Sequence, residues 1–328
     1  MRVSARYVLK RVGFALLTLW AAVTADFFLP RLMGGNPAEY IASQTSLGSP
    51  QLIAALKAEF GLTNPNPFYQ YWRYFVELAH GNLGVSYEYY PSRVGTLLWH
   101  ALPFTVGLLL VAVVISFVVG IFLGMLCAWR PGSWFDSIVV GTSFYLHAVP
   151  YFWTAMLLLL FGAFDLKAFP LGHALPAEAQ NFGPAGLVVR VLWHGVLPVL
   201  SLLLVSIAGH VLVTRNNMLQ ALSEDYVVLA RAKGLPEGQV RWRYAARTAL
   251  LPSFTGLMLS LGHVVGGALL TEIVFSYPGV GQLIYQAILN HDYPVIQGAF
   301  LIVALCVIAA NLMADLVYPL VDPRVSLT

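Results

Sequence analysis

Charged residues are scarce in this chain. Asp, Glu, Lys and Arg make up 10% of its 328 residues, whereas 59% of the residues are hydrophobic. In an ordinary soluble domain, about a quarter of the residues are charged. So few charged side chains cannot cover the surface of a water-soluble fold of this length, and the composition therefore predicts a chain embedded in a membrane.

Sequence motifs of catalysis and metal binding are also missing. The chain contains no GxxxxGK[ST] sequence to hold ATP phosphates, no GxSxG nucleophile turn and no HExxH pair. Its eight histidines show neither HxH nor HxxxH spacing, and its two cysteines, Cys127 and Cys306, fall within long apolar runs. We therefore expect no enzyme activity, no metal site and no cofactor in this chain.

Six apolar runs are each long enough to cross about 30 Å of hydrocarbon as a helix. The first run is too long for the core of a signal peptide, so we expect it to be retained as a span. The sequence thus predicts an all-α, polytopic membrane protein with six transmembrane helices. The runs cover residues 7–29, 102–129, 138–164, 196–213, 254–275 and 295–318.

The cations are distributed unevenly along the chain. If the N-terminus is cytoplasmic, about two thirds of the 18 Lys and Arg residues fall in inner segments, although the outer loops are longer. Cytoplasmic loops typically carry such an excess, so we expect a multi-pass protein with both termini in the cytoplasm. The net charge of +3 comes from several separate loops and forms no basic stripe, which argues against nucleic-acid binding.

The largest soluble segment, between the first two spans, contains two expected short helices. One covers residues 50–61, and the other follows Asn66 with the aromatic sequence PFYQYWRYFVELAH. These aromatic rings suit a helix at the depth of the lipid head groups, with direct ligand contact as the alternative. The predicted segments are 1–30 (N-terminal end and first span), 31–97 (extracytoplasmic, with short helices) and 98–328 (a five-helix core with a cytoplasmic loop at about 215–252).

The cytoplasmic loop combines small residues, a Gly-Leu-Pro turn and several cations. We expect a helix over 220–233 that stops at Gly234, where glycine makes a positive φ available. A second short helix is expected to begin near Pro236 and to run toward Arg247.

On this second helix, Val240 and Tyr244 are expected to form an apolar strip beside Arg243 and Arg247, which are four residues apart on one face. The loop would then present both apolar and charged side chains to a partner. A plainer interpretation is a loop whose cations only fix the topology of the chain.

The motifs in this loop resemble the EAA loop of permease subunits of ABC importers, and specifically of the dipeptide/oligopeptide/nickel permease family. The sequence ARAKGL at 230–235, followed by ALLP at 249–252, carries the resemblance. Further similar motifs extend over almost the whole chain. They are GNPA at 35–38, FGL at 60–62, GNLGVS at 81–86, EIVFSYPGVG at 272–281 and DPR at 322–324.

This resemblance implies the type I ABC importer permease fold, in the inner membrane of a prokaryote. The chain would form half of a pathway for di- and oligopeptides delivered by an extracytoplasmic binding protein. Besides that protein and membrane lipid, the implied partners are a homologous second permease and two ATPase subunits, which would hold ATP and Mg. The loop would couple to an ATPase through Tyr226, Ala230, Arg231, Ala232, Lys233, Gly234, Leu235, Pro236, Arg243 and Arg247.

An acidic residue near the end of the fifth expected span is the candidate for an outer gate. Glu272 precedes a Tyr-Pro-Gly sequence, where the proline must end the helix. We expect its carboxylate to accept hydrogen bonds from backbone amides at this break, and substrate contact is the alternative. The gate candidates are Glu272, Tyr277, Pro278, Gly279 and Gly281.

Two alternatives stay open at this point. An ion-coupled secondary transporter would need buried acid or base relays and broken helices in paired positions, and the sequence indicates neither. A second alternative keeps the same importer family but replaces peptides by nickel chelates, glutathione or opines.

Overall fold

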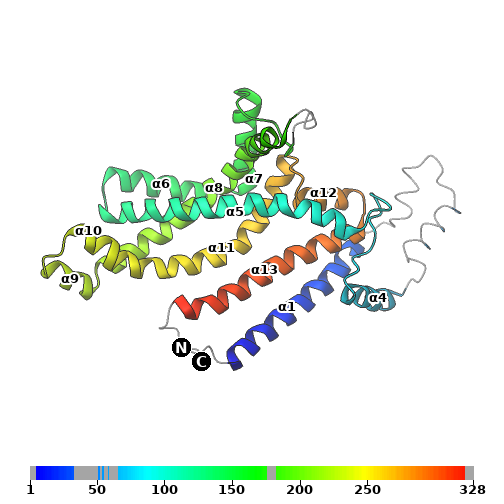
Figure 1. The fold of residues 1–328 in the computed structure, drawn as a ribbon, viewed down its shortest axis with the longest axis horizontal. Coiled ribbons are helices and arrows are strands. Elements are labelled where there is room, and N and C mark those ends of the chain that lie inside the picture. The colour runs from blue at the N-terminus through cyan, green and yellow to red at the C-terminus, as the bar shows by residue number, and fades with distance from the viewer. Residues whose placement is uncertain are drawn as a thin grey trace. The chain divides into compact units, whose positions relative to one another are not determined.

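The computed structural model describes residues 5–32, 66–175 and 182–321, together with the single residues 51, 54 and 58. For residues 5–7, 251, 255–256, 258–267 and 314–321 it describes the backbone only. The helix expected at 50–61 lies outside the continuously described residues. All regular elements of the described residues are helices, apart from one isolated bridge between Val85 and Arg93 (Figure 1). The all-α prediction is confirmed.

The helices are long where the sequence is continuously apolar and short around the two hydrophilic loops. Two segments, η1 and η3, are π-helical turns that continue a neighbouring α-helix. In chain order the elements are α1 (Ala5–Leu32), α4 (Pro67–Ala79), α5 (Val94–Trp129), α6 (Trp134–Ala148), α7 (Tyr151–Leu158), η1 (Leu159–Asp165), α8 (Pro184–Leu222), α9 (Asp225–Ala232), α10 (Glu237–Gln239), η3 (Val240–Ala245), α11 (Ala246–Val274), α12 (Val280–Leu289) and α13 (Tyr293–Val321).

Among the described residues, four helices are long and apolar enough to cross a membrane, namely α1, α5, α8 and α13. The bent pair of α6 with α7 and η1 supplies a fifth candidate. α11, which is 29 residues long, lies where the fifth span was expected. The polytopic architecture is therefore as predicted, and it is compatible with six spans.

The expected span over 138–164 is not one straight helix. It breaks at Val149 and Pro150 into two helices that are bent by 103°. Val149 has an extended backbone, with φ −87° and ψ 130°, because a following proline disfavours the helical conformation. Pro150 has no amide hydrogen to continue the ladder and instead precedes the first turn of α7. The span predicted here is therefore broken into two helices and is not one continuous helix.

The chain forms two compact units. The first unit contains residues 1–12, 106–277 and 309–328, and the second contains residues 13–105 and 278–308. In the first unit α8 is the central helix and packs against α6, α7 and α11. Its buried side chains recur every three or four residues, as expected for a helix that buries one broad face. They include Leu197, Ser201, Leu202, Val205, Ala208, Val211, Thr214, Met218 and Ala221.

Two glycines let α5 approach α8 closely within the first unit. A Cβ atom added at Gly120 would lie 2.5 Å from the Cβ of His210. A Cβ atom added at Gly124 would lie 2.7 Å from the carbonyl oxygen of Val211 and 2.9 Å from the Cβ of Thr214. Both helices would have to move apart to admit a side chain at either position.

The substitution Gly124→Ala is therefore expected to destabilise the folded chain by about 1–3 kcal/mol, the usual cost of overpacking a close contact. Thermal unfolding of the detergent-solubilised protein measures this change. The matched control is Gly107→Ala on the same helix, where an added Cβ meets no atom within 4 Å. Equal unfolding temperatures for the two variants would contradict the close contact of α5 with α8.

Candidate coupling and gating sites

The turn at Gly234 closes α9 by a Schellman motif. The amide of Leu235 donates to the carbonyl of Ala230 at 3.3 Å, and the amide of Gly234 donates to the carbonyl of Arg231 at 2.9 Å. Gly234 has a φ of +72°. This left-handed conformation turns the chain back after the end of α9. Glycine adopts it with almost no steric cost, because it has no Cβ atom. The predicted helix stop and positive φ are both confirmed.

The boundaries of the two loop helices differ from the prediction. The expected helix over 220–233 is interrupted, because α8 ends at Leu222 and α9 begins only at Asp225. Glu224 between them has an extended backbone, with φ −73° and ψ 146°, which separates the two helices. The second loop helix does not stop near Arg247, because α10 and η3 continue without a break into α11.

A cluster of small and apolar side chains fixes the loop to the helices behind it. α9 contributes Val227 and Ala230, which are 0% and 2% exposed, and η3 contributes the fully buried Val240. The prediction that Val240 faces a partner beside Tyr244 was therefore wrong. The other buried members are Met125 and Ala128 of α5, Met218 and Ala221 of α8, and Ala245, Ala246 and Ala249 at the start of α11.

Arg241 ties the loop to the end of α5. Its guanidinium carbon lies 2.9 Å from the centroid of the Trp129 ring, in a cation–π contact. The sequence marked this arginine only as one inner cation, and only the fold shows that it contacts Trp129. The motion of η3 and the motion of the end of α5 are consequently linked.

The opposite side of the loop is exposed and mixes apolar with cationic side chains. Among the predicted coupling residues, Ala230 is buried and Leu235 is partly buried, so these two support the loop from inside. Arg231 pairs with Glu237 across the turn at 3.3 Å. The exposed set consists of Tyr226, Val228, Leu229, Trp242 and Tyr244, with Arg231, Lys233, Arg243 and Arg247.

A partly buried ion pair, which the sequence did not indicate, joins α6 to α8 in the first unit. Nε of Arg215 donates to Oδ1 of Asp136 at 2.6 Å, and its Nη2 donates to Oδ2 at 2.8 Å. The amide of Gly132 also donates to Oδ2 at 2.9 Å. This bidentate geometry holds the loop before α6 against the part of α8 that leads into α9.

The end of α11, which carries Glu272, is closed by a second Schellman motif. The amide of Tyr277 donates to the carbonyl of Glu272 at 2.8 Å, and the amide of Ser276 donates to the carbonyl of Ile273 at 3.2 Å. Ser276 takes the left-handed position with a φ of +47°. These two amides donate to backbone carbonyls. The predicted role of the Glu272 carboxylate as a hydrogen-bond acceptor at this break stays a prediction.

Glu272 and Tyr277 are nevertheless buried together. Glu272 is 0% exposed and Tyr277 is 4% exposed. Burial, and then the negative charge of Glu272, raise the pKa of the Tyr277 hydroxyl. The remaining gate candidates follow the break: Pro278 and Gly279 precede α12, and Gly281 lies in its first turn. The side-chain oxygen of Thr105 accepts a hydrogen bond from the amide of Val280 at 2.8 Å.

The loop after η1 is fixed on the end of α11. The amide of His173 donates to the carbonyl of Phe275 at 2.9 Å. Nδ1 of His194, on α8, donates to the carbonyls of Gly172 and His173, both at 3.0 Å. No sequence pattern connects these residues, because they are far apart along the chain. The described residues contain no group of three His, Cys, Asp or Glu side chains able to hold a metal ion.

The long apolar helices of the described residues, together with the loop of short helices that carries several cations, are typical of a polytopic membrane protein. Residues 120–327 match the family described as the binding-protein-dependent transport system inner membrane component. The chain belongs to this family of ABC importer permeases, which are transport components and not enzymes. The match does not favour the alternative of an ion-coupled secondary transporter.

Relatives are similar over nearly their full length. The dipeptide transport system permease protein DppB of Escherichia coli is 33% identical over 98% of this chain and 98% of its own length. The di/tripeptide transport system permease protein DppB of Pseudomonas aeruginosa is 33% identical, over 97% and 98%. The oligopeptide transport system permease protein AppB of Bacillus subtilis is 32% identical, over 98% and 99%.

A substitution at Gly234 tests whether the left-handed turn holds α9 in place. A Cβ added at Gly234 would meet no atom within 4 Å, so Gly234→Val strains only the backbone, by about 1–3 kcal/mol. Faster amide hydrogen exchange is expected over residues 225–245. Gly238→Val is the matched control, because Gly238 is equally uncrowded and lies in a helix with ordinary φ. If the two variants show the same amide hydrogen exchange over residues 225–245, the left-handed turn does not hold α9 in place.

Proposed function

We propose that this inner-membrane component is one of two homologous permease subunits that together form a translocation pathway for di- and oligopeptides. The cargo is inferred from the names of the relatives, which are dipeptide, di/tripeptide and oligopeptide permeases. Each of them is similar to this chain over almost its whole length. An extracytoplasmic binding protein delivers the cargo, and two ATPase subunits hold ATP and Mg.

The observation that carries this proposal is the α9–η3 surface, defined by the exposed residues of α9 and η3. It exposes five large apolar or aromatic side chains, of which Val228 and Leu229 are each 55% exposed. Apolar side chains surrounded by cations are typical of a surface that binds a protein partner. We assign this surface to an ATPase subunit.

The packing of α9 and η3 against the other helices explains how the ATPase would be coupled to the pathway. When ATP binding moves the ATPase, α9 and η3 move with it, since the Schellman turn holds them in one fixed arrangement. The cluster around Ala230 and Val240 transmits this motion to α5, α8 and α11, because a close-packed interior is not readily compressed. The subunit thereby alternates between two states of the pathway.

The orientation follows from the cation count. The α9–η3 surface and both termini lie in the cytoplasm, where loops are enriched in Lys and Arg. The outer loop fixed by His194 and the segment that contains α4 would then face the binding protein.

Uptake into proteoliposomes tests this function. The chain is reconstituted with its second permease and both ATPases, with binding protein and labelled dipeptide outside and ATP inside. Uptake that depends on internal ATP is expected, and Gly234→Val should reduce it strongly while Gly238→Val does not. Uptake without ATPases, driven by an ion gradient, would show a secondary transporter. Uptake with ATP only outside would contradict the orientation.

We further propose that Glu272 stabilises the outward-closed resting state, since it is fully buried beside Tyr277 at the end of α11. Glu272→Gln keeps the shape but removes the charge, and charge-assisted hydrogen bonds contribute about 1.5–3 kcal/mol. The variant is expected to assemble normally and to hydrolyse ATP faster without the binding protein. Asp165→Asn, at an exposed carboxylate, is the control. Normal basal hydrolysis with weaker transport of one cargo would instead indicate substrate contact.

A further inference from the structure

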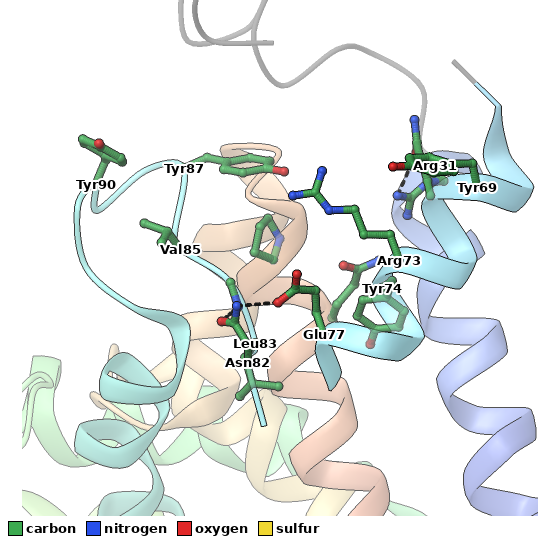
Figure 2. A pocket seen from close by; sticks show the side chains of 14 residues that line it. Arg31, Tyr69, Arg73, Tyr74, Glu77, Asn82, Leu83, Val85, Tyr87 and Tyr90 are labelled. Carbon is green, nitrogen blue, oxygen red and sulfur yellow. Dashed lines mark hydrogen bonds between the residues drawn. The ribbon is translucent and has the colours of Figure 1, made fainter. Parts of the chain in front are cut away.

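The second unit contains a cavity of about 300 Å³, lined by both polar and apolar groups, beside the end of the first helix. Figure 2 shows its lining side chains, with Arg31 at the end of α1 and Arg73 extending from α4 toward Tyr87. The far wall is formed by the segment that precedes α5 and by the start of α13, which contributes Gln297. This volume lies at the lower end of the range of small-ligand sites.

The helix α4 divides into two faces at this cavity. Its apolar face, with Phe68, Trp72, Phe75 and Val76, is exposed, and Phe68 and Trp72 are 79% and 67% accessible. Its polar face points into the cavity and carries Tyr69, Gln70, Arg73, Tyr74 and Glu77. Such a helix lies in an interface, with its rings toward the acyl chains and its polar side toward the head groups.

Contacts with α1 fix the depth of α4 relative to the membrane surface. The hydroxyls of Tyr71 and Thr24 are 3.0 Å apart, and the ring centroids of Tyr71 and Phe27 are 5.3 Å apart. Arg31 donates from Nη2 to Oε1 of Gln70 at 3.1 Å. α1 is a candidate span that ends at Leu32, so these contacts lie within its last turns, where a span reaches the head groups.

Two arginines and one glutamate are the charged residues of the described cavity lining. Arg73 is exposed and makes no hydrogen bond or ion pair with the described residues, so its five donors are available. Arg31 uses three donors, on Gln70 and on the carbonyl of Phe27. The carboxylate of Glu77 accepts a hydrogen bond from Asn82 at 2.7 Å, drawn in Figure 2. The lining thus contains two guanidinium groups and one carboxylate.

Two further polar groups in the lining are buried without a partner among the described residues. They are the hydroxyl of Tyr74 and Nε2 of Gln297, a residue that is only 7% exposed. Burial raises the pKa of Tyr74, so its hydroxyl keeps its proton and can donate. Buried donors without partners are costly, and both groups belong to residues of the cavity lining.

We propose that this cavity binds the phosphate of an anionic phospholipid head group, with Arg73 and Arg31 as the charged contacts. A phosphate offers the acceptors that guanidinium groups recognise best. The surroundings favour lipid over peptide cargo, because most of α1 is exposed, with only 17% of its most apolar window buried. A bound lipid would hold α4 against α1 at the membrane surface.

Native mass spectrometry of the assembled transporter with dioctanoylphosphatidylglycerol tests this site. Arg73→Gln is expected to raise the Kd about tenfold, which corresponds to about 1.4 kcal/mol. Glu77→Gln is expected to lower the Kd, because it removes the only carboxylate in the described lining while keeping an acceptor for Asn82. The control Arg93→Gln changes an exposed cation of the same unit outside the lining and should leave the Kd unchanged.

Opposite effects of Arg73→Gln and Glu77→Gln distinguish charge recognition from a general loss of structure. An unchanged Kd in Arg73→Gln, or equal binding of dioctanoylphosphatidylcholine, would overturn the proposal. Displacement of the lipid by inorganic phosphate at similar concentration would assign the site to a free anion. Displacement by a dipeptide would assign it to the cargo, and either result excludes a dedicated lipid site.

Discussion

Every backbone amide and carbonyl that leaves water must find a partner within the protein, and this requirement determines how the helices of this chain can end. Two helix ends solve it in the same way. α9 and α11 both close with paired hydrogen bonds around a left-handed residue, Gly234 in one case and Ser276 in the other. The closure at Gly234 directs the chain toward η3, and the closure at Ser276 leaves the carbonyl of Phe275 to accept from His173.

Small side chains pack the loop formed by α9 and η3 tightly into the first unit. Alanines at 128, 221, 230, 245, 246 and 249 are all nearly inaccessible, so the backbones of α5, α8, α9 and α11 approach closely there. Polar contacts support this packing at two places, through Arg241 on Trp129 and through Arg215 on Asp136. The chain also departs from a simple helix bundle at Pro150, where a helix is broken. Such breaks are frequent in transporters.

Buried polar side chains organise the second unit in a similar way. Asp292 is fully buried at the start of α13, where its side chain accepts hydrogen bonds from the hydroxyl of Ser86 and the amide of Glu88. The segment that forms one wall of the head-group cavity is thus anchored beside the helix that supplies Gln297. A sequence signal for Asp292 existed, because an aspartate two residues before a proline often begins a helix, although the partner Ser86 is 206 positions away.

The sequence by itself determined the all-helical membrane fold, the importer family and the turn at Gly234, because hydropathy, motif spacing and the conformational freedom of glycine are local properties. The predicted roles of the coupling and gate residues remain predictions. Only the tertiary structure decided that Val240 faces inward, that the helix over 220–233 divides before α9, and that Arg31 and Arg73 share a cavity. These features depend on which surfaces meet across long sequence distances, and no local pattern specifies such contacts.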